Sequence, residues 1–200
     1  MAVDFTMMYV AHDAFSRDLR RLSAACERGD ETAPSVLAGW EMFKKQLSIH
    51  HTAEDVALWP ALREKVTFPE EFAVLDEMEI EHAQLEPLLE RLDKALAAHD
   101  TANALETTRV LADALTGHMR HEESQALPLV EARLGERGWQ AFGRYFRKTQ
   151  GLSGGAEFFP WLLDSAPDAT RTRVLSMFPA PVRFLYRRVW APRYQRTMHW

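Results

Sequence analysis

The sequence has one cysteine among its 200 residues and no long apolar run. A lone cysteine, Cys26, cannot form an internal disulfide, so a disulfide scaffold and a cysteine-ligated zinc or iron–sulfur site are excluded. No stretch reaches the roughly 18 apolar residues of a membrane span, and the first residues lack the basic and apolar regions of a signal peptide. These absences predict a cytoplasmic protein.

Negative charge is missing from the end of the chain, because residues 169–200 contain seven arginines and no Asp or Glu. Residues 1–168 hold 17 Lys and Arg against all 29 acids, which is a net charge of −12. Since the two parts present different surfaces, we expect a main domain over residues 1–150 and a basic, aromatic, proline-rich helical extension over residues 151–200.

Helical periodicity runs through the first 150 residues, and no segment keeps a period of two. Turn-forming residues at 29–34, 67–69, 99–102 and 135–138 separate four long helices and a short fifth helix over residues 139–150. Because connections this short join antiparallel neighbours, the sequence predicts an all-α fold, an up-down-up-down four-helix bundle.

The apolar face of each long helix is interrupted halfway along by polar residues. Every face carries a histidine, and on three helices a glutamate follows one turn later. An unpaired carboxylate in a core costs several kcal/mol, and a bound metal ion is the usual compensation. The candidate metal ligands that share this pattern are His12, His50, Glu54, His82, Glu86, His118 and Glu122.

Spacing supports a shared site for these residues. His-x-x-x-Glu places both side chains on one helix face, and residue counts from the turns put the four histidines at one height in an antiparallel bundle. Two of the segments, HHTAEDVALWP and HMRHEESQALP, are internal copies 68 residues apart. The mixed imidazole and carboxylate set suits iron or manganese, with zinc possible. Seven ligands are too many for one ion. Two octahedral ions have twelve positions, and the seven ligands, two of them bridging carboxylates, fill nine while an oxo or hydroxo bridge fills two more, which leaves one position open to a small molecule.

These motifs resemble the hemerythrin-like (HHE cation-binding) proteins over about residues 6–134. The segments that carry the resemblance are the isolated His12, HHTAEDVALWP, IEHAQLEPL and HMRHEESQALP. The resemblance implies two non-haem iron ions with an oxo or hydroxo bridge, with Glu54 and Glu122 bridging them. Oxygen-carrying hemerythrins have a second histidine where this chain has Glu86, and a hard anionic donor there disfavours reversible oxygenation.

The expected function is therefore binding or reduction of a small oxidant, namely dioxygen, hydrogen peroxide or nitric oxide, at an open iron position. Peroxide decomposition or sensing is favoured over storage, and an enzyme of this kind would have a catalase-like or oxidase-like di-iron activity. The alternatives are a non-enzymatic oxygen, iron or redox sensor that signals through the extension, and a structural zinc site. A ferritin-like centre is disfavoured because it needs two Glu-x-x-His units, and only Glu79 and His82 form one.

The extension is expected to pack its aromatic side chains on the bundle or on a second copy of the chain in a homodimer. Its segment VRFLYRRVW is basic and amphipathic, which leaves open a peripheral contact with anionic lipid or nucleic acid. No groove-reading motif predicts specific nucleic-acid recognition. His51 and His121, each beside a candidate ligand, are expected to support ligands or lie exposed, with His51 as the substitute ligand.

Overall fold

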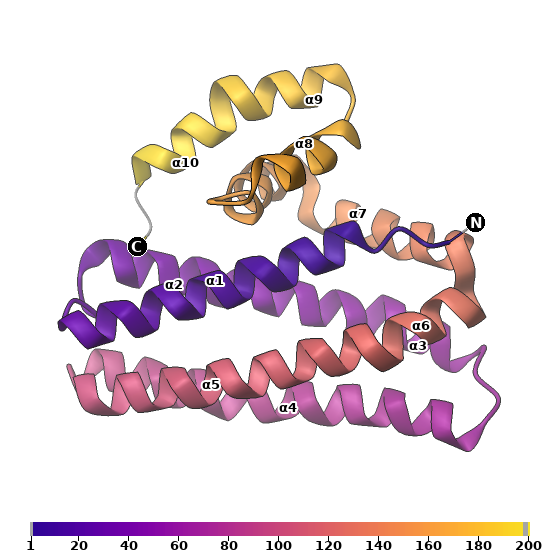
Figure 1. Ribbon diagram of the computed structural model, residues 1–200, viewed down its shortest axis with the longest axis horizontal. Helices are drawn as coiled ribbons and strands as arrows, with labels where there is room; N and C mark the ends of the chain where they lie inside the picture. Colours follow the sequence, from indigo (N-terminus) through magenta and orange to yellow (C-terminus); the bar gives the residue numbers. More distant parts are fainter. Residues whose placement is uncertain (1, 198–199) are drawn as a thin grey trace.

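Four long helices account for most of residues 6–121, in a computed structural model that describes residues 2–197 and residue 200. They are α1 (Thr6–Arg28), α2 (Pro34–Ala53), α4 (Pro69–Ala97) and α5 (Thr101–His121). Figure 1 shows them side by side. Helix α1 contacts α2 and α5, and α4 contacts α5. The described residues contain no strand, so the predicted all-α class is confirmed.

The residues at the turns explain where these helices begin and end. Gly29 ends α1 at φ 74°, a left-handed conformation that glycine adopts without a steric penalty. Pro34 occupies the first position of α2, where no backbone N–H is needed. The Asp100 carboxylate accepts the backbone N–H of Asn103 at 3.1 Å and so caps α5.

Both internal copies change from α-helical to π-helical geometry at their glutamate. These π turns are η1 (Glu54–Leu58) and η2 (Glu122–Ala126), each closed by an N–H that bonds to the glutamate carbonyl five residues earlier. Pro60 and Pro128 follow in α3 (Trp59–Arg63) and α6 (Leu127–Leu129). A proline ring clashes with the carbonyl four residues back, and a π turn before it gives the ring room. A third π turn, η3 (Val130–Leu134), follows α6.

Two apolar clusters fill the bundle, one on each side of the polar residues in mid-helix. Phe15 and Leu47 belong to one cluster, whereas Met8 and Leu58 belong to the other. His12 lies between Met8 and Phe15 along α1, and the other helices repeat this order. The polar residues therefore occupy a layer between two dry regions of the core.

The chain after the bundle breaks where a turn was predicted. A helix over residues 139–150 followed by a glycine-rich turn was expected, and the segment α7 (Gly135–Leu162) is two helices that meet at a kink at Gly151. Gly151 has φ 63° and ψ −174°, a conformation that glycine adopts without a steric penalty. The second helix resumes directly after the kink, and Phe158 and Trp161 are buried at its far end.

The extension packs on the bundle, as expected for its aromatic residues. Figure 1 shows α8 (Asp168–Ser176), α9 (Ala180–Leu185) and α10 (Ala191–Thr197) stacked over α1. The Trp161 ring lies 5.1 Å from Phe15, and its Nε1 donates to buried Asp18 at 2.7 Å. Arg17 donates to the Trp161 carbonyl at 2.9 Å. The extension and the bundle therefore share one apolar cluster.

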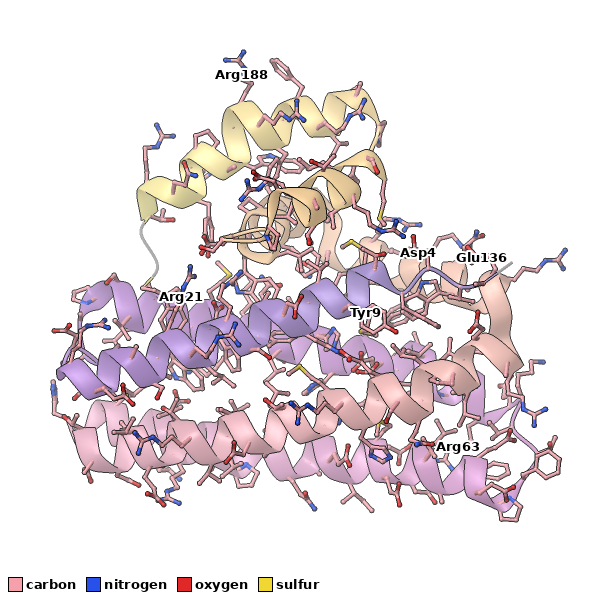
Figure 2. All side chains as sticks on the ribbon, in the orientation of Figure 1. Asp4, Tyr9, Arg21, Arg63, Glu136 and Arg188 are labelled. Carbon is pink, nitrogen blue, oxygen red and sulfur yellow. The ribbon has the colours of Figure 1, made fainter. Side chains whose placement is uncertain are left out.

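The outer side of the extension stays uncovered. Phe184 is 62% exposed, Leu185 and Val189 are exposed nearby, and Arg188 points away from the bundle in Figure 2. A π turn, η4 (Tyr186–Trp190), joins α9 to α10. Among the described residues no helix combines the length and the apolar character that crossing a membrane requires. Peripheral lipid contact and a homodimer stay predictions.

Candidate metal centre

Six of the seven predicted ligands lie together in the polar layer of the bundle. The four long helices supply one histidine each, and the first residues of η1 and η2 supply the two glutamates. All six side chains are buried, and Glu54 and Glu122 have no exposed surface. These residues are His12, His50, Glu54, His82, His118 and Glu122.

One half of the layer holds His12, His50 and Glu122, whose candidate ligand atoms all lie within 4.8 Å of one another. The Nε2 of His12 lies 3.0 Å from a Glu122 oxygen. The His12 and His50 rings meet edge to face with centroids 5.5 Å apart. Two imidazoles and a carboxylate this close form a set that could hold one metal ion.

The other half holds His51, His82 and His118, again with candidate ligand atoms within 4.8 Å. The Nε2 atoms of His82 and His118 are 3.1 Å apart, and His51 stacks on His82 at 3.9 Å. One Glu54 oxygen lies 3.1 Å from His50 Nε2 and the other lies 3.6 Å from His82 Nε2. Glu54 therefore stands between the two groups with one oxygen toward each.

The two glutamates lack the partners that a buried carboxylate needs. All four of their carboxylate oxygens are buried, and none accepts a hydrogen bond from the described residues. Burial, together with the charges of Glu122 and Asp55, raises the pKa of Glu54 well above its ordinary value. Leaving buried charges uncompensated costs several kcal/mol, and cations between the histidine groups would compensate them. The donor set therefore fits a pair of metal ions.

The electrostatic surroundings shift the pKa values of the histidines in opposite directions. Burial lowers the pKa of His12, but the carboxylates of Glu122 and Glu123 beside its ring outweigh burial and raise this pKa to about 9. Burial and the neighbouring histidines hold the pKa of His50 and of His51 well below the usual value. His50 and His51 are therefore neutral near pH 7, the form in which imidazole binds a metal.

Three carboxylates outside the two groups orient the histidine rings. Glu123 lies 2.6 Å from His12 Nδ1, and Asp55 lies 2.9 Å from His82 Nδ1. Glu81 holds the Nδ1 of His118 in the same way, at 2.9 Å. A carboxylate on one ring nitrogen leaves Nε2 free to face a metal.

The sequence prediction missed these orienting carboxylates, although the sequence contains a signal for two of them. An acid directly follows the ligand glutamate in both internal copies, as Asp55 after Glu54 and Glu123 after Glu122. Each orients a histidine on another helix, so the repeated acid has a positioning role.

Glu86 is the predicted ligand that belongs to neither group and, unlike Glu54, does not lie between them. It is exposed, whereas Leu85 beside it is buried. One turn after His82, the residue that points into the bundle is thus Leu85, at position i+3, whereas Glu86, at position i+4, points outward. His51 occupies the place beside His82 instead. Glu79, the ferritin-like candidate, is outside both groups and accepts from Arg63 at 3.3 Å.

A comparison with protein families agrees with the ligand geometry. The model of the family described as "Hemerythrin HHE cation binding domain" matches residues 3–130 of the chain. The chain belongs to the hemerythrin HHE cation-binding family. Searches of curated proteins and of solved structures gave no match. The hemerythrin match ends before α7, so the extension lies outside the region that the family describes.

Removing an orienting carboxylate should weaken metal binding by the hemerythrin domain. We expect Asp55→Asn and Glu123→Gln each to lower metal affinity by roughly 10- to 100-fold, because the ring they hold loses its orientation. Competition with a chelator of known affinity would measure this. Glu106→Gln, an exposed carboxylate on α5, is the matched control and should bind as the wild type does. Unchanged affinity in both variants would contradict the positioning role.

Proposed function

We propose that this hemerythrin domain carries a non-haem di-iron centre that binds or reduces a small oxidant: dioxygen, hydrogen peroxide or nitric oxide. The up-down-up-down four-helix bundle and a cytoplasmic location are parts of this proposal. The observation that carries it is the pair of buried carboxylates, Glu54 and Glu122, placed without hydrogen-bond donors between two histidine groups. Iron bound there would supply the affinity for the oxidant and the electrons for its reduction.

The proposed ligands follow from the two groups. His12, His50 and Glu122 would hold one ion, the three other histidines would hold the second, and Glu54 faces both. With His51 rather than Glu86 beside His82, the set has five imidazoles and two carboxylates. The preference for ferric iron expected from a Glu86 ligand then loses its basis, so oxygen binding and peroxide reduction are both supported.

Apolar residues cover one side of the centre. Phe15 is 1% exposed and lies 5.3 Å from the His50 ring, ring centre to ring centre. Leu47, Leu85 and Leu115 are also buried in the cluster that borders the histidines. A dry border limits side reactions of a reactive intermediate with solvent.

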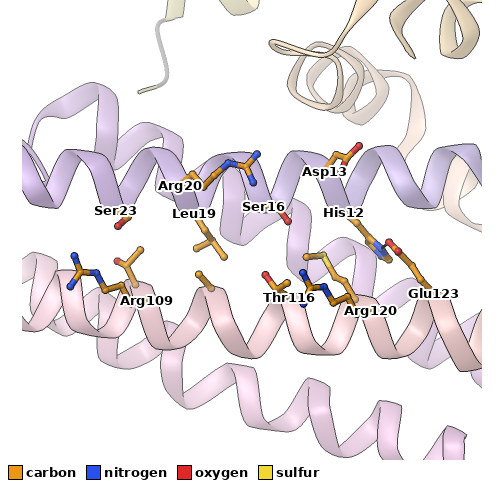
Figure 3. Close-up of a pocket in the computed structure, with 13 residues that line it drawn as sticks. His12, Asp13, Ser16, Leu19, Arg20, Ser23, Arg109, Thr116, Arg120 and Glu123 are labelled. Carbon is orange, nitrogen blue, oxygen red and sulfur yellow. Dashed lines mark hydrogen bonds and ion pairs between the residues drawn. The ribbon is translucent and has the colours of Figure 1, made fainter. Parts of the chain in front are cut away.

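A groove between α1 and α5 reaches the centre from the surface. It has a volume of about 430 Å³, and His12 and Glu123 line one end of it. Figure 3 shows Ser16, Arg20, Thr116 and Arg120 along its walls. This groove ends at the His12 ring, which we assign as a metal ligand. It is therefore the proposed access route for the oxidant.

Metal analysis and absorption spectroscopy test the proposal directly. Protein produced with added iron should contain about two iron ions per chain, as its two ligand groups require. Its near-ultraviolet and visible bands should bleach with dithionite and return in air. Stoichiometric zinc, or an intact helical fold without metal, would refute the di-iron centre.

A sensor that signals through the extension is the second candidate function. The ring centre of Phe15 lies 5.3 Å from that of His50 on one side and 5.1 Å from that of Trp161 of α7 on the other. A change at the centre can therefore reach the extension through a single side chain. Peroxide turnover by the iron-loaded protein would favour the enzyme. Hydrogen-exchange protection of residues 151–200 that follows the metal state, without turnover, would favour the sensor.

A further inference from the structure

A second groove, between α2 and α4, reaches the other half of the centre. Its volume is about 470 Å³, and His51 and His82 form part of its lining. No Lys or Arg lines it, whereas its acidic lining residues are Asp55, Glu79, Glu86, Glu90 and Asp93. The groove between α1 and α5 differs, because Arg20, Arg109 and Arg120 line it. The two sides of the centre therefore open through grooves of different charge.

Most of the acids in the α2–α4 groove already have partners. Asp55 holds His82, and Arg63 donates to Glu79. Lys44 donates to Asp93 at 2.8 Å, and Lys94 lies 3.5 Å from Glu90.

Glu86 is different, because its carboxylate forms neither a hydrogen bond nor an ion pair with any described residue. It lies one helical turn from His82 on the same wall of the groove, exposed and free to bind a cation.

The inner end of the groove leads to nitrogen donors. The His51 ring makes contacts with neighbouring histidine rings and forms no hydrogen bond within the described residues. It belongs to the group with His82 and His118 that could hold a metal ion. A cation captured at Glu86 would thus find unused donors directly inward.

We propose that the α2–α4 groove is the route by which divalent cations reach the metal centre, with Glu86 as the carboxylate that captures them first. The proposal rests on the metal centre of the proposed function. An acid-lined cleft concentrates cations, and carboxylate oxygens exchange hydrated divalent ions readily. Glu86, expected from the sequence to be a permanent ligand, would then act in loading the centre.

Uptake kinetics separate a capturing residue from a ligand. Stopped-flow mixing of the metal-free, full-length chain with Co²⁺ would follow the visible bands of the bound ion. We expect Glu86→Gln to slow uptake roughly two- to fivefold at low ionic strength, because one charge of the focusing field is lost. The final stoichiometry and spectrum should match the wild type. Raising the salt to about 0.5 M should shrink the difference, since screening weakens the attraction.

Two further variants control this measurement. Ala83→Lys places a positive charge on the exposed groove wall without removing any acid, and it should slow uptake at least as much. Glu106→Gln removes an exposed carboxylate of α5 that lines neither groove, and it should leave the rate unchanged.

Each other outcome has a definite meaning. Wild-type rates for both groove variants would overturn the route. A changed spectrum or a lost ion in Glu86→Gln would make Glu86 a ligand and overturn its capturing role. A wild-type chain that takes up no metal would refute the metal centre itself, and with it the route.

Discussion

Glu54→Gln will abolish binding of the metal pair and will also make the metal-free protein more stable. Glu54 is fully buried, it stands between both histidine groups, and no described residue donates a hydrogen bond to it. Glutamine keeps the shape but removes the bridging charge. Because a buried charge without compensation destabilises a fold, we expect a gain of about 1–3 kcal/mol in the free energy of unfolding.

The gain from Glu54→Gln depends on pH. Burial raises the pKa of Glu54 in the folded state well above the ordinary 4.5, so the folded protein holds a proton that the unfolded chain has released. The wild type therefore loses stability as the pH rises from about 4.5 to the raised pKa of Glu54, and loses no more from this group at higher pH. The advantage of the variant should be absent below about pH 4.5 and present at pH 7.

Urea unfolding of the metal-free chains at both pH values, with metal analysis of the loaded chains, measures the two effects. Glu106→Gln should change neither, because its carboxylate is exposed and forms no ion pair within the described residues. A metal-free Glu54→Gln protein that is less stable than the wild type would show that the fold compensates this carboxylate without metal.

Trp161→Ala should cost about 3–5 kcal/mol of unfolding free energy, the range for a large aromatic side chain removed from a core. Trp161 is fully buried, its ring lies 5.1 Å from Phe15, and its Nε1 donates to Asp18. The variant leaves a cavity beside α1 and removes a donor from a buried carboxylate. Trp161→Phe fills part of the cavity but still removes the donor, so its cost should be smaller.

Urea unfolding monitored by circular dichroism would measure the loss, since the signal reports the whole helical fold. Phe184→Ala is the matched control from the same extension, because its ring is 62% exposed and its loss should change stability by less than about 0.5 kcal/mol. Equal stabilities of Trp161→Ala and the wild type would mean that the extension is an appendage and not part of the core.

The sequence alone determined the helices of the bundle and most of the residues that meet in its centre. Helix limits depend on short-range signals such as Gly29, Pro34 and Asp100, which act within a few residues. The histidines could be placed because a helix repeats every 3.6 residues and rises by a fixed distance per residue. The number of residues between a turn and a histidine therefore gives the position of that histidine along the bundle axis. Their burial among apolar neighbours then followed from the periodicity.

Tertiary structure decided which neighbours complete the centre. Several neighbouring positions share one face of a helix, so periodicity alone does not tell which of them points into the core. In the structure, the orientation of α4 about its axis places Leu85 inward and Glu86 outward. Contacts between helices placed His51 against His82. The kink at Gly151 lies where the glycine-rich turn was predicted, but the packing of the second half of α7 on the bundle, with Trp161 buried beside Phe15, was decided by tertiary contacts. Contacts between distant segments set these outcomes, and their energies exceed the local preferences that a sequence pattern records.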